Sequence, residues 1–135
     1  MSSDFSMPVL VVEDFSTMGR IICGLLTQIG FQHVDLARDG TTALGKMRDI
    51  RYGLVISDWN MQPMTGLDLL KQIRLDSALA HTRFIMMSAQ SSLDHVHVAK
   101  TAGVDGYLVK PFNAPTLKAK IDAVFANKGT DLDVE

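Results

Sequence analysis

Cysteine is nearly absent from this chain, which has Cys23 alone among its 135 residues. One thiol cannot form an intramolecular disulfide or a Cys-X-X-Cys pair, which excludes a disulfide-stapled fold and a dithiol redox motif. We therefore expect Cys23 to be a small core residue in a protein of the reducing cytoplasm.

An excess of basic charge is absent as well. The chain has 13 Lys and Arg against 15 Asp and Glu, a net charge of −2, so direct binding to nucleic acid is not expected. No apolar run reaches the roughly 18 residues that a membrane helix needs. We expect a soluble protein with no membrane association, and residues 1–7 do not resemble a signal peptide.

The length is that of one globular domain, which we expect to cover residues 8–128 between short tails at 1–7 and 129–135. Short apolar runs recur along it, and most are unbroken instead of alternating with polar residues. Unbroken runs are typical of strands buried on both faces of a parallel sheet. The predicted strands are 9–12, 33–36, 54–56, 84–87 and 107–109.

The segments between these runs have a helical period. The clearest has apolar residues at helical spacing from Met18 to Ile29, which predicts a helix from Ser16 or Thr17 to Gly30. The segment 92–101 has the poorest apolar pattern, so we expect it to be mobile or to lean on a partner. Further helices are predicted from 41 or 42 to 49, and over 65–76, 92–101 and 114–126.

Five strands alternating with five helices predict a doubly wound α/β fold, because parallel strands need right-handed crossover connections. Such folds carry their functional site at the carboxyl ends of the strands. Polar residues within two positions of the predicted strand ends are therefore candidates for chemistry: Glu13, Asp14, Asp58, Ser88 and Lys110.

Taken singly, each of these residues has a structural explanation, such as a turn or the amino end of a helix. Taken together they do not, because Glu13, Asp14 and Asp58 would repel one another unless a cation lay between them. Mg²⁺ suits a few carboxylates and a loop carbonyl. Zinc and redox metals are disfavoured because paired His or Cys ligands are missing.

A carboxylate beside Mg²⁺ and a lysine is placed to attack phosphorus. The ion and Lys110 would neutralise the phosphoryl oxygens, and the Ser88 hydroxyl would donate a hydrogen bond to one of them. The predicted product is an aspartyl phosphate on Asp58.

Four segments, 11–18, 55–61, 87–89 and 106–112, resemble the receiver domains of two-component response regulators, in particular CheY-like single-domain regulators. The resemblance covers about residues 8–128 and implies a flavodoxin-like sheet of order 2-1-3-4-5. It also implies that the protein is a switch with no metabolic substrate, and that it acts as a monomer.

By this resemblance, Asp58 is the phosphoacceptor. Glu13, Asp14, Asp58 and the backbone carbonyl of Asn60 would bind Mg²⁺. The family has a proline four residues after the phosphoacceptor, whereas this chain has Gln62 there and Pro63 next, which leaves the shape of that loop to the structure.

Other roles are also carried over by resemblance. Ser88 and Lys110 match the family's hydroxyl and lysine, and Tyr107 matches the aromatic residue that turns inward when the hydroxyl moves toward the phosphate. Asn60 and Gln90 flank the site and would tune dephosphorylation. The Lys110–Pro111 bond is expected to be cis.

The implied phosphoryl donor is a histidine kinase or another phosphohistidine protein. The implied output is binding of a protein such as a flagellar motor switch component, on a face that includes Val96, Tyr107, Val109 and Lys120. A phosphate sink or shuttle within a phosphorelay is the alternative that the sequence leaves open.

Two other classes of protein are less favoured. A flavin-binding electron carrier of the same fold needs an uncharged phosphate-binding loop where Glu13 and Asp14 stand. A phosphohydrolase with an aspartyl nucleophile needs a second acid two residues after Asp58, where Asn60 stands. Trp59 is expected to be a partly exposed loop residue, and His95 is expected on a solvated helix face.

Overall fold

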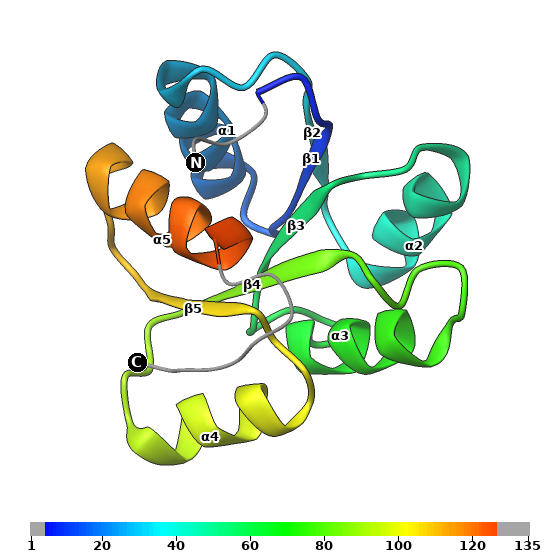
Figure 1. Ribbon diagram of the computed structural model, residues 1–135. Helices are drawn as coiled ribbons and strands as arrows, with labels where there is room; N and C mark the ends of the chain where they lie inside the picture. The colour runs from blue at the N-terminus through cyan, green and yellow to red at the C-terminus, as the bar shows by residue number, and fades with distance from the viewer. Residues whose placement is uncertain (1–4, 127–135) are drawn as a thin grey trace.

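The structure is a computed structural model that describes residues 5–126 (Figure 1). The predicted tail 129–135, residues 1–4 of the other predicted tail, and the last two residues of the predicted domain lie outside this range. Five parallel strands form one sheet in the order β2-β1-β3-β4-β5. The predicted doubly wound fold and strand order are confirmed.

The three central strands are buried along nearly their whole length, because helices cover both faces of the sheet. Only Arg83, the first residue of β4, is partly exposed among them. The edge strands β2 and β5 are only partly buried. The strands are β1 (Val9–Val12), β2 (Val34–Ala37), β3 (Leu54–Asp58), β4 (Arg83–Ser88) and β5 (Gly106–Val109).

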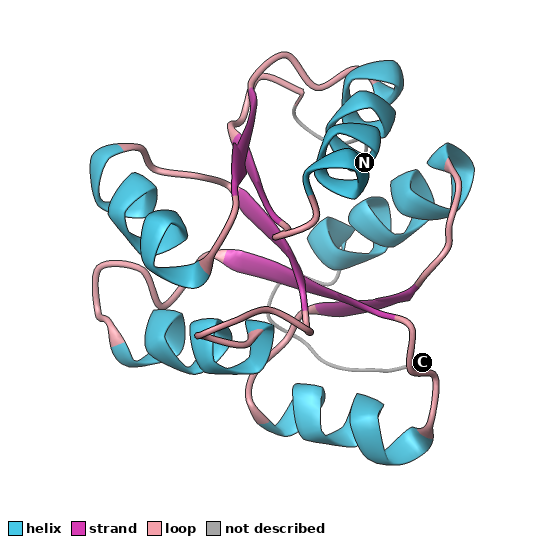
Figure 2. Ribbon diagram, turned by 180° about the vertical axis from the view of Figure 1, so that it is seen from behind, coloured by secondary structure: helices cyan, strands magenta, loops and turns pink. Residues whose placement is uncertain are grey.

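Figure 2 shows the helices on both sides of this sheet. Helices α1 (Ser16–Ile29) and α5 (Ala114–Ala126) pack on one face, around Ile22, Leu26 and Ile121. Helices α2 (Gly40–Asp49) and α3 (Gly66–Leu75) supply the core of the other face. None of the described helices is long and apolar enough to cross a membrane.

Helix α4 (Leu93–Thr101) has fewer buried residues than any other described helix, in keeping with its poor apolar pattern. Ala99 is its only buried residue. Its amino end is capped by Ser92, whose hydroxyl accepts a hydrogen bond from the His95 backbone. At its other end, Arg74 of α3 donates to the carbonyl of Gly103 and to Asp105 over 3.0 and 2.9 Å. The carboxyl end of α4 is therefore held to α3, whereas the Ser92 cap lies within the helix itself.

Candidate functional site

Three carboxylates meet at the carboxyl ends of β1 and β3, as the sequence predicted. Oxygen atoms of Glu13, Asp14 and Asp58 all lie within 4.8 Å of one another. One detail of the prediction was wrong: Asp58 and Ser88 are the last residues of β3 and β4 and do not follow these strands. They still pair with the neighbouring strands, Asp58 with Met87 and Ser88 with Val109, because backbone pairing does not require an apolar side chain.

Lys110 joins two of these carboxylates. Its Nζ lies 2.9 Å from Asp58 Oδ1 and 3.1 Å from Glu13 Oε1. Glu13 and Asp58 are buried, with 2% and 5% of their surface exposed, whereas Asp14 is exposed. The buried pair therefore depends on one ammonium group for its charge balance.

The charges shift the pKa values of this group. Burial, followed by the neighbouring Asp58 carboxylate, raises the pKa of Glu13 above its ordinary value, and Lys110 only partly offsets this. For Lys110, burial lowers the pKa, but the hydrogen bond and charge of Asp58 together with Glu13 outweigh it and the net shift is upward. The site thus disfavours charge on Glu13 and favours charge on Lys110.

These acids fit a hard divalent cation. Carboxylate oxygens are the ligands that Mg²⁺ prefers, and no His or Cys belongs to the cluster, which is the only such group among residues 5–126. The exposure of Asp14 and of Asn60 leaves that side of the site open to the water ligands that Mg²⁺ retains.

Ser88 lies on the other side of Asp58, at the end of β4, and is almost fully buried. Its hydroxyl accepts a hydrogen bond from the Gln90 backbone over 3.0 Å. The carbonyl of Gln90 accepts from the Tyr107 hydroxyl over 2.7 Å. The predicted hydroxyl and the predicted aromatic residue are therefore linked through one loop residue, Gln90, whose side chain is exposed.

The loop after Asp58 depends on a glycine that sequence reasoning missed. A Cβ at Gly66 would overlap the Asp58 carbonyl oxygen, and the Gly66 backbone donates to the Trp59 carbonyl over 2.8 Å. Only glycine permits this close approach. Two features of the sequence could have pointed to this glycine. Gly66 follows a loop, and Thr65 and Asp68 have the spacing of a helix capping box.

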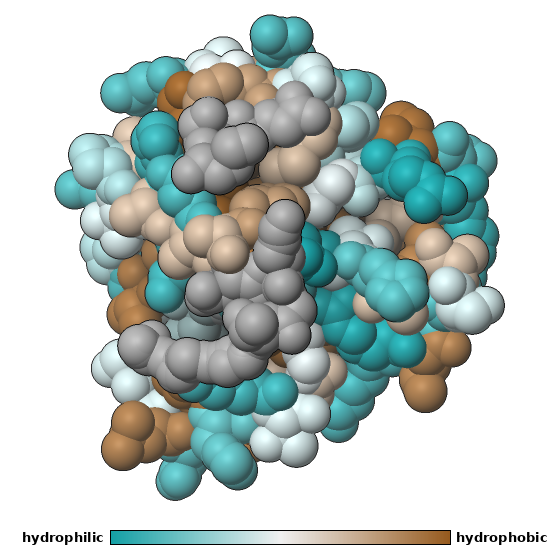
Figure 3. All heavy atoms as spheres, in the orientation of Figure 1, coloured by the Kyte–Doolittle hydropathy of each residue, from teal (hydrophilic) through white to brown (hydrophobic). Residues whose placement is uncertain are grey.

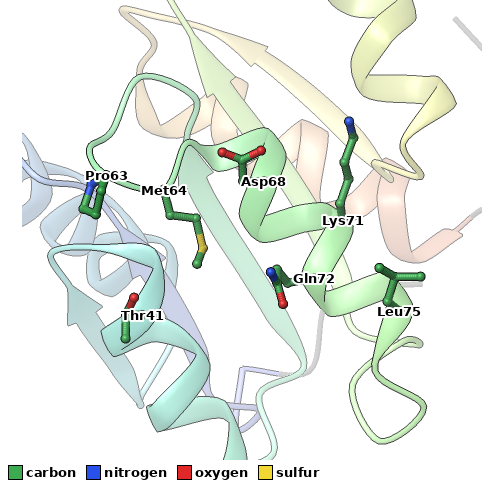
Figure 4. A pocket seen from close by; sticks show the side chains of 7 residues that line it. All are labelled: Thr41, Pro63, Met64, Asp68, Lys71, Gln72 and Leu75. Carbon is green, nitrogen blue, oxygen red and sulfur yellow. The ribbon is translucent and has the colours of Figure 1, made fainter.

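Both X-Pro bonds near the site are cis, Gln62–Pro63 and Lys110–Pro111, and the second confirms the prediction. The loop with Pro63 runs to Met64, which packs where a side chain on Gly40 would stand. Pro63 and Met64 line a hollow of about 500 Å³ between α2 and α3. Figure 4 shows the side chains that surround it. None of the predicted site residues lines this hollow.

The residues predicted for a partner surface come from α4, β5 and α5. Val109 is 41% exposed, Val96, Tyr107 and Lys120 are half-buried, and Lys120 also lines a shallow hollow on α5. Leu93 at the start of α4 is 85% exposed. Figure 3 shows hydrophobic residues over α4, with hydrophilic residues beside them.

One expectation for α4 was wrong. His95 is half-buried and does not lie on a fully solvated face, because its ring packs against Trp59 with 5.3 Å between ring centroids. Trp59 is partly exposed, as expected. Cys23 is half-buried beside the α1 core and not fully inside it.

Known proteins resemble this chain over most of its length. The family model of the response regulator receiver domain matches residues 9–122. Chemotaxis protein CheY-3 of Vibrio cholerae is 46% identical over 120 residues, which cover 89% of this chain and 92% of that protein. Chemotaxis protein CheY of Pseudomonas aeruginosa is 46% identical over 119 residues, covering 88% and 96%. The solved structure of CheY4 of Vibrio cholerae superposes with a TM-score of 0.83 at 34% identity, covering 88% of this chain and 98% of that one.

Proposed function

This chain belongs to the family of response regulator receiver domains, and we propose that it is a Mg²⁺-dependent phosphoacceptor of chemotaxis signalling. In this role Asp58 receives a phosphoryl group from a histidine kinase or another phosphohistidine protein. The phosphorylated form then signals from the cytoplasm by binding a protein target. The protein promotes its own phosphorylation and dephosphorylation but converts no metabolite.

The observation that carries this proposal is the position of Lys110. Its Nζ reaches Asp58 Oδ1 at 2.9 Å and Glu13 Oε1 at 3.1 Å, beside the exposed Asp14. A lysine held against a buried carboxylate can stabilise negative charge that builds on an incoming phosphoryl group. An arrangement needed only for stability would not require a cluster of three acids.

The proposed reaction is a single displacement. A carboxylate oxygen of Asp58 forms a bond to phosphorus while the N–P bond of the donor histidine breaks, and the donor imidazole leaves with the electron pair of that bond. Lys110 moves its hydrogen bond from the carboxylate to a phosphoryl oxygen, and the Ser88 hydroxyl donates to another.

Glu13, Asp14, Asp58 and the Asn60 carbonyl are the proposed ligands of Mg²⁺. When bound, the ion would neutralise charge on the phosphoryl oxygens and on the clustered acids. The oxygen-only donor set supports this assignment.

The names of the relatives support the chemotaxis assignment, since two curated relatives with 46% identity are chemotaxis proteins. For the output we propose the face that includes Val96, Tyr107, Val109 and Lys120, with a flagellar motor switch component as the kind of target. The switch would pass from Ser88 through Gln90 to Tyr107.

The proposal is tested with acetyl phosphate and Mg²⁺ as the phosphoryl source. Intact-protein mass spectrometry should find one added phosphoryl group on the wild type and none on Asp58→Asn. The matched control is Asp94→Asn, an exposed acid on α4, which should be labelled like the wild type. Undiminished labelling of Asp58→Asn would overturn the assignment.

A further inference from the structure

Three aromatic rings from separate elements meet beside the phosphoacceptor. The ring of Trp59, which directly follows Asp58, lies 5.3 Å from the His95 ring on α4 and 6.3 Å from the Tyr107 ring on β5, measured between centroids. Both pairs are edge-to-face, with interplanar angles of 65° and 73°. This geometry is a favourable one for aromatic pairs, so Trp59 is the shared member of the cluster.

The backbone of Trp59 is held on both sides. Its N–H donates to the Met87 carbonyl of β4 over 2.9 Å, and its carbonyl accepts from Gly66 over 2.8 Å. The ring therefore has a defined position relative to the end of β3. A displacement of the backbone after Asp58 would move this ring, and the rings of His95 and Tyr107 that contact it would have to move as well.

His95 lies in the first turn of α4, and its side chain contacts the residue that caps this helix. Its Nδ1 lies 2.8 Å from the hydroxyl of Ser92, the residue that also caps this helix. Because Ala99 is the only buried residue of α4, few other contacts set the position of this end. At the other end, the helix is followed by a loop that Arg74 binds through Gly103 and Asp105.

We propose that His95 is a positioning residue, which couples the amino end of α4 to the phosphoacceptor loop through the ring of Trp59. Phosphorylation displaces the backbone after Asp58, the Trp59 ring shifts, and the first turn of α4 moves while Arg74 retains the far end. This inference rests on the proposed function, because it assumes that Asp58 is the group that changes.

This coupling is separate from the one through Ser88. That connection runs along the loop after β4, from the Ser88 hydroxyl to Gln90 and on to the Tyr107 hydroxyl. It involves neither His95 nor the end of β3. The two connections meet at the contact between Trp59 and Tyr107. Because His95 is not part of the Ser88 connection, its removal should disturb α4 and spare the Ser88 loop.

The test uses beryllofluoride with Mg²⁺ as the phosphoryl mimic and follows backbone amides by NMR. In the wild type, amides of Asp14, Gln90, Tyr107 and residues 93–96 should all shift. In His95→Leu, the shifts of residues 93–96 should fall to less than half of their wild-type size, while those of Asp14, Gln90 and Tyr107 persist. His95→Phe keeps a ring against Trp59 and should recover most of the α4 response.

The matched control is His97→Leu, which changes an exposed histidine on the same helix and should respond like the wild type. Trp59 is the only tryptophan, so its fluorescence gives a second readout: the change on adding the mimic should differ from wild type in His95→Leu and not in His97→Leu. Unchanged α4 shifts in His95→Leu would overturn the inference, and so would an equal loss at every amide. If the wild type itself shows no shift at Asp14 or Gln90, the proposed function fails and the inference fails with it.

Discussion

Lys110 Nζ lies 2.9 Å from Asp58 Oδ1, although 52 residues separate the two along the chain. The same nitrogen also reaches Glu13, so one cation balances two buried carboxylates. Because the Lys110 side chain is only 19% exposed, water cannot readily replace it. The ion pair is thus the charge balance of the site, and under the proposed function its lysine is the group that an incoming phosphoryl would engage.

Lys110→Met should therefore destabilise the protein in the absence of Mg²⁺. Removing one partner of a buried ion pair costs about 3 kcal/mol, because the remaining charges stay buried. Urea unfolding at neutral pH measures this loss. Lys118→Met is the control, since Lys118 pairs with Asp122 along α5 with 45% and 33% of their side chains exposed. Its loss should cost under about 1 kcal/mol. Equal losses in the two variants would contradict the role given to Lys110.

Asp14→Asn should raise the melting temperature without metal, because it removes one charge from a crowded acidic cluster. It should also abolish the stabilisation that Mg²⁺ gives to the wild type, which amounts to about 2.7 kcal/mol when Mg²⁺ is at one hundred times its Kd. Thermal unfolding with and without Mg²⁺ checks both parts. If Mg²⁺ stabilises both proteins equally, Asp14 is not a ligand.

Glu13→Gln should stabilise the metal-free protein at neutral pH. Burial and then Asp58 raise the pKa of Glu13 above its ordinary value of 4.5, so the folded state binds this proton more tightly than the unfolded state does. Stability is therefore lost as the pH rises from about 4.5 through the raised pKa. The advantage of Glu13→Gln should grow over that range and vanish below it. Urea unfolding as a function of pH measures it, and Asp49→Asn, at an exposed position, should show no such trend.

Asn60 and Gln90 should set the lifetime of the aspartyl phosphate. Both side chains are exposed beside the site, where their amides can orient a hydrolytic water. Asn60→Leu and Gln90→Leu should each slow the decay several-fold, measured as loss of labelled phosphoprotein after the donor is removed. Gln28→Leu on the exposed side of α1 should leave the rate unchanged. Unaltered decay in both site variants would show that this role is wrong.

Ser88→Ala should weaken the response of β5 to beryllofluoride. The substitution removes the hydroxyl that Gln90 binds over 3.0 Å, and Gln90 in turn holds the Tyr107 hydroxyl. Amide shifts at Tyr107 and Val109 should fall by at least half, and Ser88→Thr should restore them. If the amides of Tyr107 and Val109 shift fully in Ser88→Ala, the Ser88 hydroxyl does not transmit the change to β5.

Most of the fold could be predicted from the sequence. Short apolar runs, most of them unbroken, identified all five strands, and the boundaries of Val9–Val12 agree with the structure. The largest error came at strand ends, where Asp58 and Ser88 were placed outside strands that in fact include them. Hydrophobic patterning stops at the first polar residue, whereas backbone pairing continues past it.

The sequence predicted which residues form the site, but not the contacts between their side chains. Polar residues at the ends of β1, β3, β4 and β5 had to meet, because parallel strands bring their carboxyl ends to one edge. The sequence could not show that Lys110 serves both Glu13 and Asp58. It also gave no reason to join His95 to Trp59, because side-chain contacts between elements do not follow from spacing within one of them.

The sequence by itself determined the alternation of strands and helices, the placement of three acids, a hydroxyl and a lysine at one edge, and the family to which these motifs belong. These properties depend on local patterns of apolar and polar residues, which can be recognised from neighbouring positions in the sequence. Only the tertiary structure decided that Gly66 must lack a side chain beside the Asp58 carbonyl, that the Ser88 loop holds the Tyr107 hydroxyl, and that the Trp59 ring reaches His95. Each of these joins elements that meet only when the sheet is assembled, because the distance between them is set by packing and not by the chain.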